Sequence, residues 1–191
     1  MPVFAADMLP VLIGSLPVKD HDEAVRMVFE ATPDIPLWVQ LPTHPEEGMM
    51  VQFLPGLPGV TGRDDRVFVD SATATFEDAL LKFYEDYLSA TEGAGSLANT
   101  RFAMTQKEAP GFFAFLAALQ NRPKAPRALK GQITGPVTLG TGLTDQDRRA
   151  LFYDERLLDV IVKHLAMKAR WQVEKLAGFG LPCIVFLDEP A

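Results

Sequence analysis

Three short segments of the sequence carry polar groups that suit the binding of a small charged molecule. The first is Ile13-Gly14-Ser15, where a glycine allows close approach to the backbone and a serine adds a hydroxyl. The second spans 130–138 (Lys-Gly-Gln-Ile-Thr-Gly-Pro-Val-Thr), where Gln132 and Thr134 alternate with an apolar residue. The third spans 187–191 (Leu-Asp-Glu-Pro-Ala) and holds two adjacent carboxylates.

The residue types in these segments favour binding chemistry. A carboxylate directly after a buried strand, such as Asp188, binds an ammonium group through charge-assisted hydrogen bonds or takes part in proton transfer. In the structural alternative, Asp188 or Glu189 caps a following helix or pairs with an arginine. Gln132 and Thr134 lie on one side of a strand, facing either a ligand or neighbouring backbone groups. The catalytic residues stay unknown.

Apolar patterning predicts the elements that position these groups. Four buried strands, each broken by a proline or a Gly-Pro pair, are expected at residues 11–17, 36–42, 128–136 and 182–191. Helical spacing predicts helices at residues 21–31, 75–90 and 154–177, and one that begins at Pro110. A small β-hairpin is expected from residues 49–53 and 66–69, with its loop around residues 62–65.

The alternation of strands and helices predicts a single α/β domain, residues 1–191, with a mostly parallel sheet. Two architectures fit this order. The length favours an open doubly wound sheet, whereas a last strand with no covering helix favours an incomplete (β/α)8 TIM-type barrel. The chain would then supply about the first four β/α units and the hairpin insertion, since a whole barrel needs ~250 residues. In both architectures ligands bind at the carboxyl ends of strands.

Composition narrows the classes of partner and compartment. The formal net charge of -7 argues against nucleic acid. No apolar run reaches the ~20 residues of a membrane-spanning helix, and the first residues do not resemble a secretory signal. The single cysteine fits a reducing compartment, so a cytoplasmic protein is expected.

The titratable residues that suit metals are few and scattered. The three histidines and one cysteine predict no self-contained metal site. His44 directly follows the second strand and is a candidate for substrate binding. His21, in the first turn of a helix, is expected to be solvated, and His164 to be exposed or structural. Cys183 is expected to act as a small buried hydrophobe.

In this order, the three polar segments resemble the catalytic barrel of cobalamin-independent methionine synthase. More broadly, they resemble the superfamily of that barrel, uroporphyrinogen decarboxylase and the zinc-dependent corrinoid methyltransferases. The resemblance spans nearly the whole chain but only the first half of the family's barrel. It implies transfer of a methyl group, from a folate or corrinoid donor, to a zinc-bound thiolate such as that of homocysteine.

The resemblance also implies roles for particular residues. Ile13, Gly14 and Ser15 would hold the amino-acid substrate, and Asp188 would meet its ammonium group. His44 stands near the place where the methionine synthases have a substrate-binding glutamate. The family's zinc ligands lie beyond its Asp-Glu-Pro-Ala motif, so this chain alone is expected to bind no zinc and to be inactive. Two alternatives are a non-catalytic α/β domain that binds a small molecule and a uroporphyrinogen decarboxylase-like enzyme.

Overall fold

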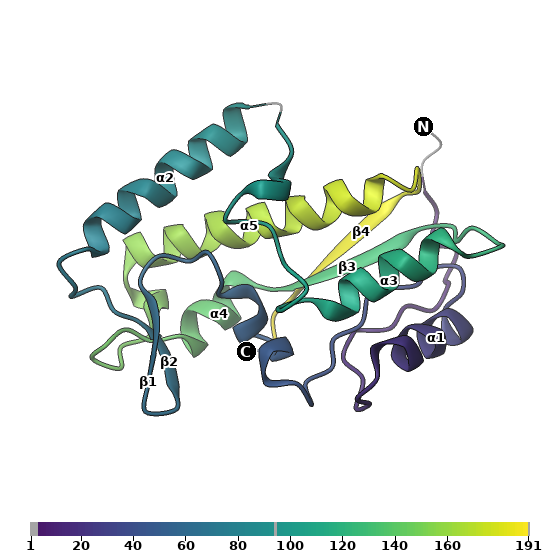
Figure 1. The fold of residues 1–191 in the computed structure, drawn as a ribbon, viewed down its shortest axis with the longest axis horizontal. Coiled ribbons are helices and arrows are strands. Elements are labelled where there is room, and N and C mark those ends of the chain that lie inside the picture. Colours follow the sequence, from purple (N-terminus) through teal and green to yellow (C-terminus); the bar gives the residue numbers. More distant parts are fainter. Residues whose placement is uncertain (1–3, 94, 191) are drawn as a thin grey trace. The chain divides into compact units, whose positions relative to one another are not determined.

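The computed structural model describes residues 4–93 and 95–190, which form a mixed α/β structure (Figure 1). Its helices are α1 (His21–Ala31), α2 (Phe76–Glu92), α3 (Pro110–Gln120), α4 (Pro136–Gly142) and α5 (Glu155–Ala177). Its strands are β1 (Val60–Arg63), β2 (Arg66–Val69), β3 (Leu129–Thr134) and β4 (Cys183–Asp188). Within the described residues, the strands form two-stranded sheets and none closes into a barrel. No helix in this part of the chain is long and apolar enough to cross a membrane.

The chain forms two compact units, each built from several stretches of sequence. The first unit comprises the residues up to Gln52, Met104–Gln132 and Gln172–Phe186. The second comprises Phe53–Ala103, Ile133–Trp171 and the residues from Leu187 onward. Stretches that belong to the two units therefore alternate along the chain.

In the first unit, α1 begins and packs as its sequence predicts. The Asp20 carboxylate caps the helix by accepting the Glu23 N–H at 2.7 Å. The buried face of α1 packs against α3, where the rings of Phe29 and Phe115 stack with centroids 5.5 Å apart. The two helices lie side by side in Figure 1. This packing holds α1, whose first residue is His21, against α3.

Parallel pairing in the first unit follows the order of the sequence. Ser15 forms a parallel bridge with Gln40, and Leu37 forms one with Lys130. The prediction of regular strands at 11–17 and 36–42 is wrong, because both segments pair only through such isolated bridges. Their flanking prolines lack the N–H that a continuous ladder needs.

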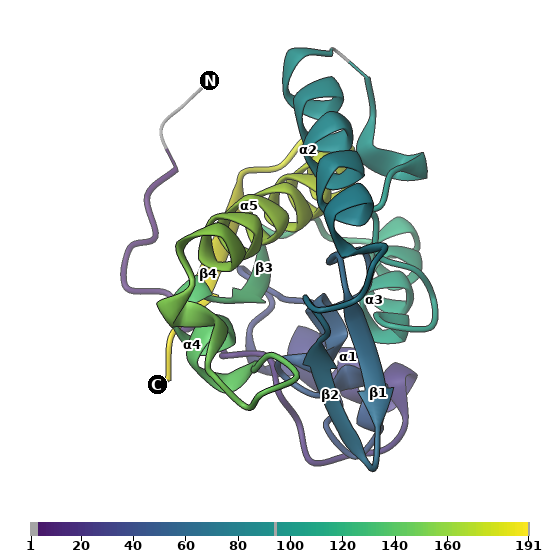
Figure 2. The same ribbon diagram turned by 90° about the vertical axis from the view of Figure 1, so that its left-hand side faces the viewer.

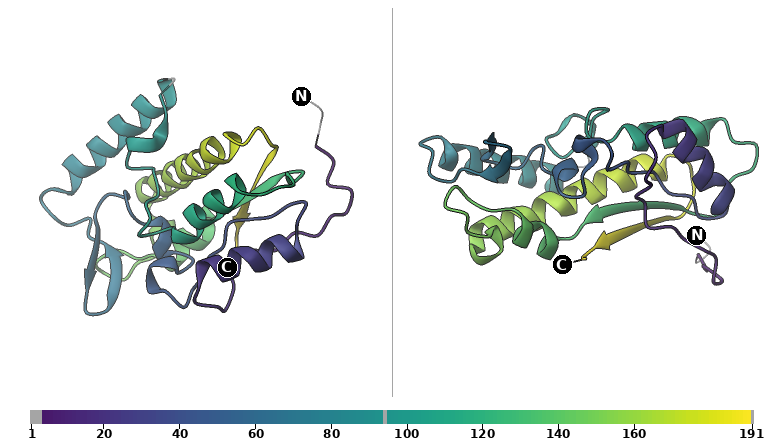
Figure 3. Two further views of the ribbon diagram at one scale, coloured as in Figure 1. Left: turned by 45° about the vertical axis from the view of Figure 1, so that its right-hand side comes forward. Right: turned by 90° about the horizontal axis from the view of Figure 1, so that it is seen from below.

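The sheet continues from β3 to β4, which lie side by side in the right-hand view of Figure 3. In the first unit, the Leu129 N–H donates to the Pro182 carbonyl at 2.9 Å. In the second unit, the Gly135 N–H donates to the Asp188 carbonyl at 2.9 Å. Both partners advance together along the chain, so the two strands are parallel. The expected strands at residues 128–136 and at the end of the chain are confirmed.

The hairpin lies in the second unit and is shorter than predicted (Figure 2). Its strands β1 and β2 are antiparallel, with Arg63 opposite Arg66. Asp64 and Asp65 form the two-residue turn with φ of 52° and 57°, a conformation that aspartate tolerates better than most residues. The prediction that residues 49–53 form an arm is wrong, since Val51–Phe53 is a 3₁₀ turn.

The core of the second unit surrounds a histidine. Phe83 on α2 packs edge-to-face against Phe102, with ring centroids 5.8 Å apart. His164 on α5 lies tilted against both rings and is fully buried. Its Nε2–H donates to the Phe53 carbonyl at 2.8 Å. The alternative that His164 is structural is therefore the one that the fold supports.

Candidate functional site

The first two polar segments lie against each other in the first unit. Gly14 has φ of 147°, and a Cβ at this position would lie 2.7 Å from Gln132 Nε2. Lys130 Nζ donates to the Ile13 carbonyl at 2.6 Å. Lys130 and Gln132 reach the same segment because side chains two residues apart share one face of a strand. Gly14 therefore permits a contact that any side chain would block.

The Gln132 side chain belongs to a buried ring of hydrogen bonds. Its Nε2 donates to the Trp38 carbonyl at 2.7 Å. Trp38 Nε1 donates to Gln172 Oε1 at 2.9 Å, and Gln172 Nε2 donates to the Gln132 carbonyl at 2.9 Å. All three side chains are fully buried. Protein groups thus supply the partners that a buried glutamine requires, which favours the structural alternative for Gln132.

Ser15 offers polar groups on an open edge. Gln40 donates to the Gly14 carbonyl and accepts the Leu16 N–H, both at 3.0 Å, so the backbone groups of Ser15 point the other way. Among the described residues, Ser15 has no hydrogen bond from its backbone or its hydroxyl. A cavity of about 310 Å³ lies along residues 11–16 and is also lined by Val28 and Leu37. Ser15 therefore stands beside a mostly apolar opening.

The second and third polar segments meet in the second unit. The Glu189 carboxylate accepts the Val137 N–H at 3.0 Å and the Thr138 N–H at 2.7 Å. These N–H groups belong to the first turn of α4, a helix that the sequence did not predict. Asp188 is half-buried at the end of β4, and Thr134 is buried at the end of β3. The structure thus supports the alternative in which Glu189 caps a helix, but the capped helix, α4, precedes Glu189 in the sequence.

The contact of Glu189 depends on a glycine and changes its pKa. A Cβ at Gly135 would lie 2.1 Å from Glu189 Cδ, so only glycine leaves room for the carboxylate. Burial acts to raise the pKa of Glu189, but hydrogen bonds from Thr138 and Val137 outweigh it and leave the pKa below its usual value. Glu189 is therefore a charged cap that stabilises α4.

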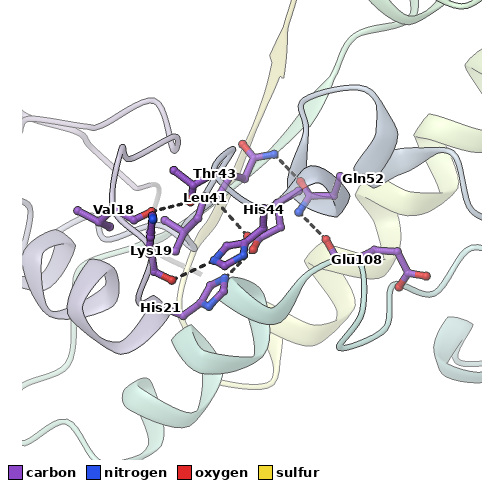
Figure 4. Close-up of polar contacts among 10 residues, drawn as sticks. Val18, Lys19, His21, Leu41, Thr43, His44, Gln52 and Glu108 are labelled. Atoms are coloured by element: carbon purple, nitrogen blue, oxygen red, sulfur yellow. Dashed lines mark hydrogen bonds and ion pairs between the residues drawn. The ribbon is translucent and has the colours of Figure 1, made fainter. Parts of the chain in front are cut away.

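Three side chains that are far apart or unremarked in the sequence come together in the first unit: His21, His44 and Glu47. Figure 4 shows the two histidine rings side by side. His21 Nε2 lies 2.6 Å from Glu47 Oε1. The His21 and His44 rings stack with centroids 5.2 Å apart and an angle of 19° between planes. The prediction that His21 is solvated is wrong, since its side chain is half-buried against this pair.

Backbone groups fix the cluster from two sides. The Glu47 side chain is buried, and its Oε2 accepts the Leu41 N–H at 3.1 Å. His44 Nε2 donates to the Lys19 carbonyl at 2.9 Å (Figure 4). The four-residue spacing from His44 through Glu47, with Pro45 at the start of a turn, is the one local signal of this cluster. His21 is 26 residues from Glu47 in the sequence, so its position gives no local signal that it joins the cluster.

A second hydrogen-bonded chain in Figure 4 anchors the same loop. Gln40 Nε2 donates to Gln52 Oε1, and Gln52 Nε2 donates to the Glu108 carbonyl at 2.7 Å. Both glutamines are buried. Because the loop between them is held at each end, His44 and Glu47 have fixed positions.

The zinc implied by the resemblance has no matching ligand set in the described residues. The one cysteine, Cys183, begins β4 and is half-buried, with Sγ 3.6 Å from the Leu181 carbonyl oxygen. Burial raises the pKa of the Cys183 thiol, which disfavours the thiolate that binds zinc. The residues present therefore do not fit a thiolate-ligated zinc ion.

Comparisons with protein-family models, with curated proteins and with solved structures find no match to this chain. Its function is therefore inferred from the motifs and from the contacts they make.

Proposed function

We propose that this chain supplies the amino-acid-binding part of an S-methyltransferase of the methionine synthase type. The observation that carries the proposal is the position of segment 130–138, which contacts both other motifs. In the first unit, Lys130 and Gln132 reach Ile13 and Gly14. In the second unit, the start of α4 receives the carboxylate of Glu189. Segment 130–138 thus contacts the first motif within one unit and the third motif within the other.

The order of the parallel segments supports an incomplete (β/α)8 barrel as the architecture. Residues 11–17 pair with 36–42, residues 36–42 pair with β3, and β3 pairs with β4. Consecutive parallel strands are neighbours throughout a barrel, whereas a doubly wound sheet reverses its order at a switch point. No reversal occurs among these four segments, which favours the barrel over the open sheet.

The substrate that best fits the proposal is a small amino acid with a thiol, such as homocysteine. Ser15 presents its hydroxyl and backbone beside an apolar cavity, which suits a short side chain and a polar head group. Asp188 would pair with the substrate ammonium group. The thiolate-binding zinc, and a folate or corrinoid methyl donor, would be held by residues other than those of this chain.

The binding part of the proposal is testable on this chain alone. Calorimetric titration with L-homocysteine under reducing conditions should show saturable binding. Asp188→Asn should weaken that binding by about tenfold or more, since a hydrogen bond to a charged group is lost, and Ser15→Ala should weaken it less. Ser89→Ala, an exposed serine on α2, serves as the matched control. Absence of binding, or binding unchanged by both substitutions, would contradict the proposal.

A further inference from the structure

His44 and Glu47 lie on one side of a single turn. His44 is the residue before the 3₁₀ turn Pro45–Glu47, and its carbonyl accepts the Glu47 N–H at 3.0 Å. One potential ligand atom of His44 lies within 4.8 Å of one of Glu47. The imidazole and the carboxylate therefore project together, which is the arrangement that two ligands of one ion require.

The Glu47 carboxylate is almost completely buried and negatively charged groups are rarely buried without a cation or a metal ion. One oxygen is oriented by the Leu41 N–H, and the other lies 2.6 Å from His21 Nε2. A backbone donor that orients a carboxylate in this way is typical of the outer shell of metal sites.

The hydrogen bond of His44 leaves a free ligand atom. The Lys19 carbonyl is only an acceptor, so His44 Nε2 must carry the proton of the neutral ring. Nδ1 then has the lone pair that a metal ion needs. A ring nitrogen that donates to a backbone carbonyl while the other binds the ion is the usual arrangement of metal-bound histidine.

We propose that His21, His44 and Glu47 bind one divalent transition-metal ion, with Zn²⁺ as the probe. One potential ligand atom from each residue lies within 4.8 Å of the other two. Around a tetrahedral zinc ion, nitrogen and oxygen ligands stand about 3.3 Å apart. The ion would replace the hydrogen bond between His21 Nε2 and Glu47 Oε1, so the proton of that bond would move to Nδ1 of the ring or to water, and the 2.6 Å contact would widen.

This site departs from the expectation that the chain binds no metal, and it goes beyond the proposed function. Its ligands are two imidazoles and a carboxylate, whereas the set of the resembled family includes two cysteine thiolates. Three protein ligands leave a coordination position for water. His21 and His44 are half-buried, so solvent and the ion can reach them from the surface of the first unit.

The first test measures zinc affinity with the full chain. The protein is freed of metal with a chelator and titrated with Zn²⁺ in competition with a chromophoric chelator. We expect one equivalent of zinc to bind, and Glu47→Gln or His44→Gln to weaken the affinity by about tenfold or more. Glu46→Gln, at an exposed carboxylate of the same turn, should leave the affinity unchanged. Substoichiometric binding, or equal affinity in all four proteins, would overturn the proposal.

A second test needs no variant. Long-range ¹H–¹⁵N spectra of the wild-type chain resolve its imidazole rings during the zinc titration. The signals of His21 and His44 should shift, while those of His164, buried in the other unit, should stay in place. A titration that leaves the first two rings unchanged, or that moves His164 equally, would overturn the proposal even if a variant failed to fold.

Discussion

The histidines of the two units lie in opposite surroundings. In the first unit, His21 and His44 are half-buried, stack on each other and lie beside the Glu47 carboxylate. In the second unit, His164 is fully buried, and the charged groups that act on it are the cations of Lys168 and Arg101. The same side chain is thus placed beside an anion in one core and near cations in the other.

The pKa of His164 shows what its surroundings do. Burial, together with the charges of Lys168 and Arg101, lowers the pKa of His164 to about 3, although the hydrogen bond to the Phe53 carbonyl opposes this shift. The His164 ring is therefore neutral and has a structural role in the core of the second unit. His21 and His44 instead lie beside the Glu47 carboxylate, which attracts cations, and both are accessible to solvent. Neighbouring charge, more than residue type, separates a structural histidine from a candidate ligand.

The largest expected effect tests whether His164 is a buried, neutral histidine. Below pH 6.5 the unfolded chain protonates this ring while the folded protein does not, so stability should fall by about 1.4 kcal/mol per pH unit down to pH about 3. His164→Gln keeps a donor for the Phe53 carbonyl and should remove this contribution. Urea unfolding of both proteins across that pH range measures the difference. Identical slopes would show that His164 is not the buried neutral group described.

The next effect concerns Glu47, the carboxylate beside the His21–His44 pair. Without metal, Glu47→Gln should lower the free energy of unfolding by about 2 kcal/mol, since charge-assisted hydrogen bonds from Leu41 and His21 are weakened. Glu46→Gln on the same turn is the control and should change little. Equal stability of the two variants in urea unfolding would remove the contrast between a buried and an exposed carboxylate.

A smaller effect is expected at Glu189, a more exposed carboxylate that also accepts backbone N–H groups. Glu189→Gln should cost about 0.5 kcal/mol at neutral pH, since solvent screens its interaction with α4. Because the pKa of Glu189 in the folded protein lies below the ordinary value of 4.5, this contribution is present above that value and is lost as pH falls through the folded pKa. Thermal melts at neutral and acidic pH measure the difference between variant and wild type. A larger loss at acidic pH would contradict the sign.

The smallest effect sets the baseline for surface charges. Glu77 Oε1 and Arg156 lie 3.0 Å apart, with side chains 70% and 57% exposed. Glu77→Gln should change the free energy of unfolding by no more than about 0.3 kcal/mol, because water and salt screen exposed pairs. A change as large as that of Glu47→Gln would show that exposure does not rank these carboxylates.

Much of the local structure could be predicted from the sequence. The cap of α1 at Asp20, the start of α3 at Pro110 and the strands β3 and β4 follow from nearby residues. The segments at 11–17 and 36–42 were wrongly predicted to be regular strands. An apolar run does not show whether its prolines leave enough backbone N–H donors for a continuous β-ladder. The arm at 49–53 was wrong although the predicted loop at 62–65 contains the turn, because a two-residue turn pairs the residues directly beside it, Val60–Arg63 with Arg66–Val69.

The sequence by itself determined which residues carry polar chemistry and which elements hold them. Only the tertiary structure decided what those residues face. Glu189 caps a helix that lies about fifty residues before it, and Gln132 completes a ring with Trp38 and Gln172. His21 reaches Glu47 because α1 packs on α3 and because a turn orients the carboxylate. Contacts between distant residues depend on how whole elements pack, and local residue spacing does not record that packing.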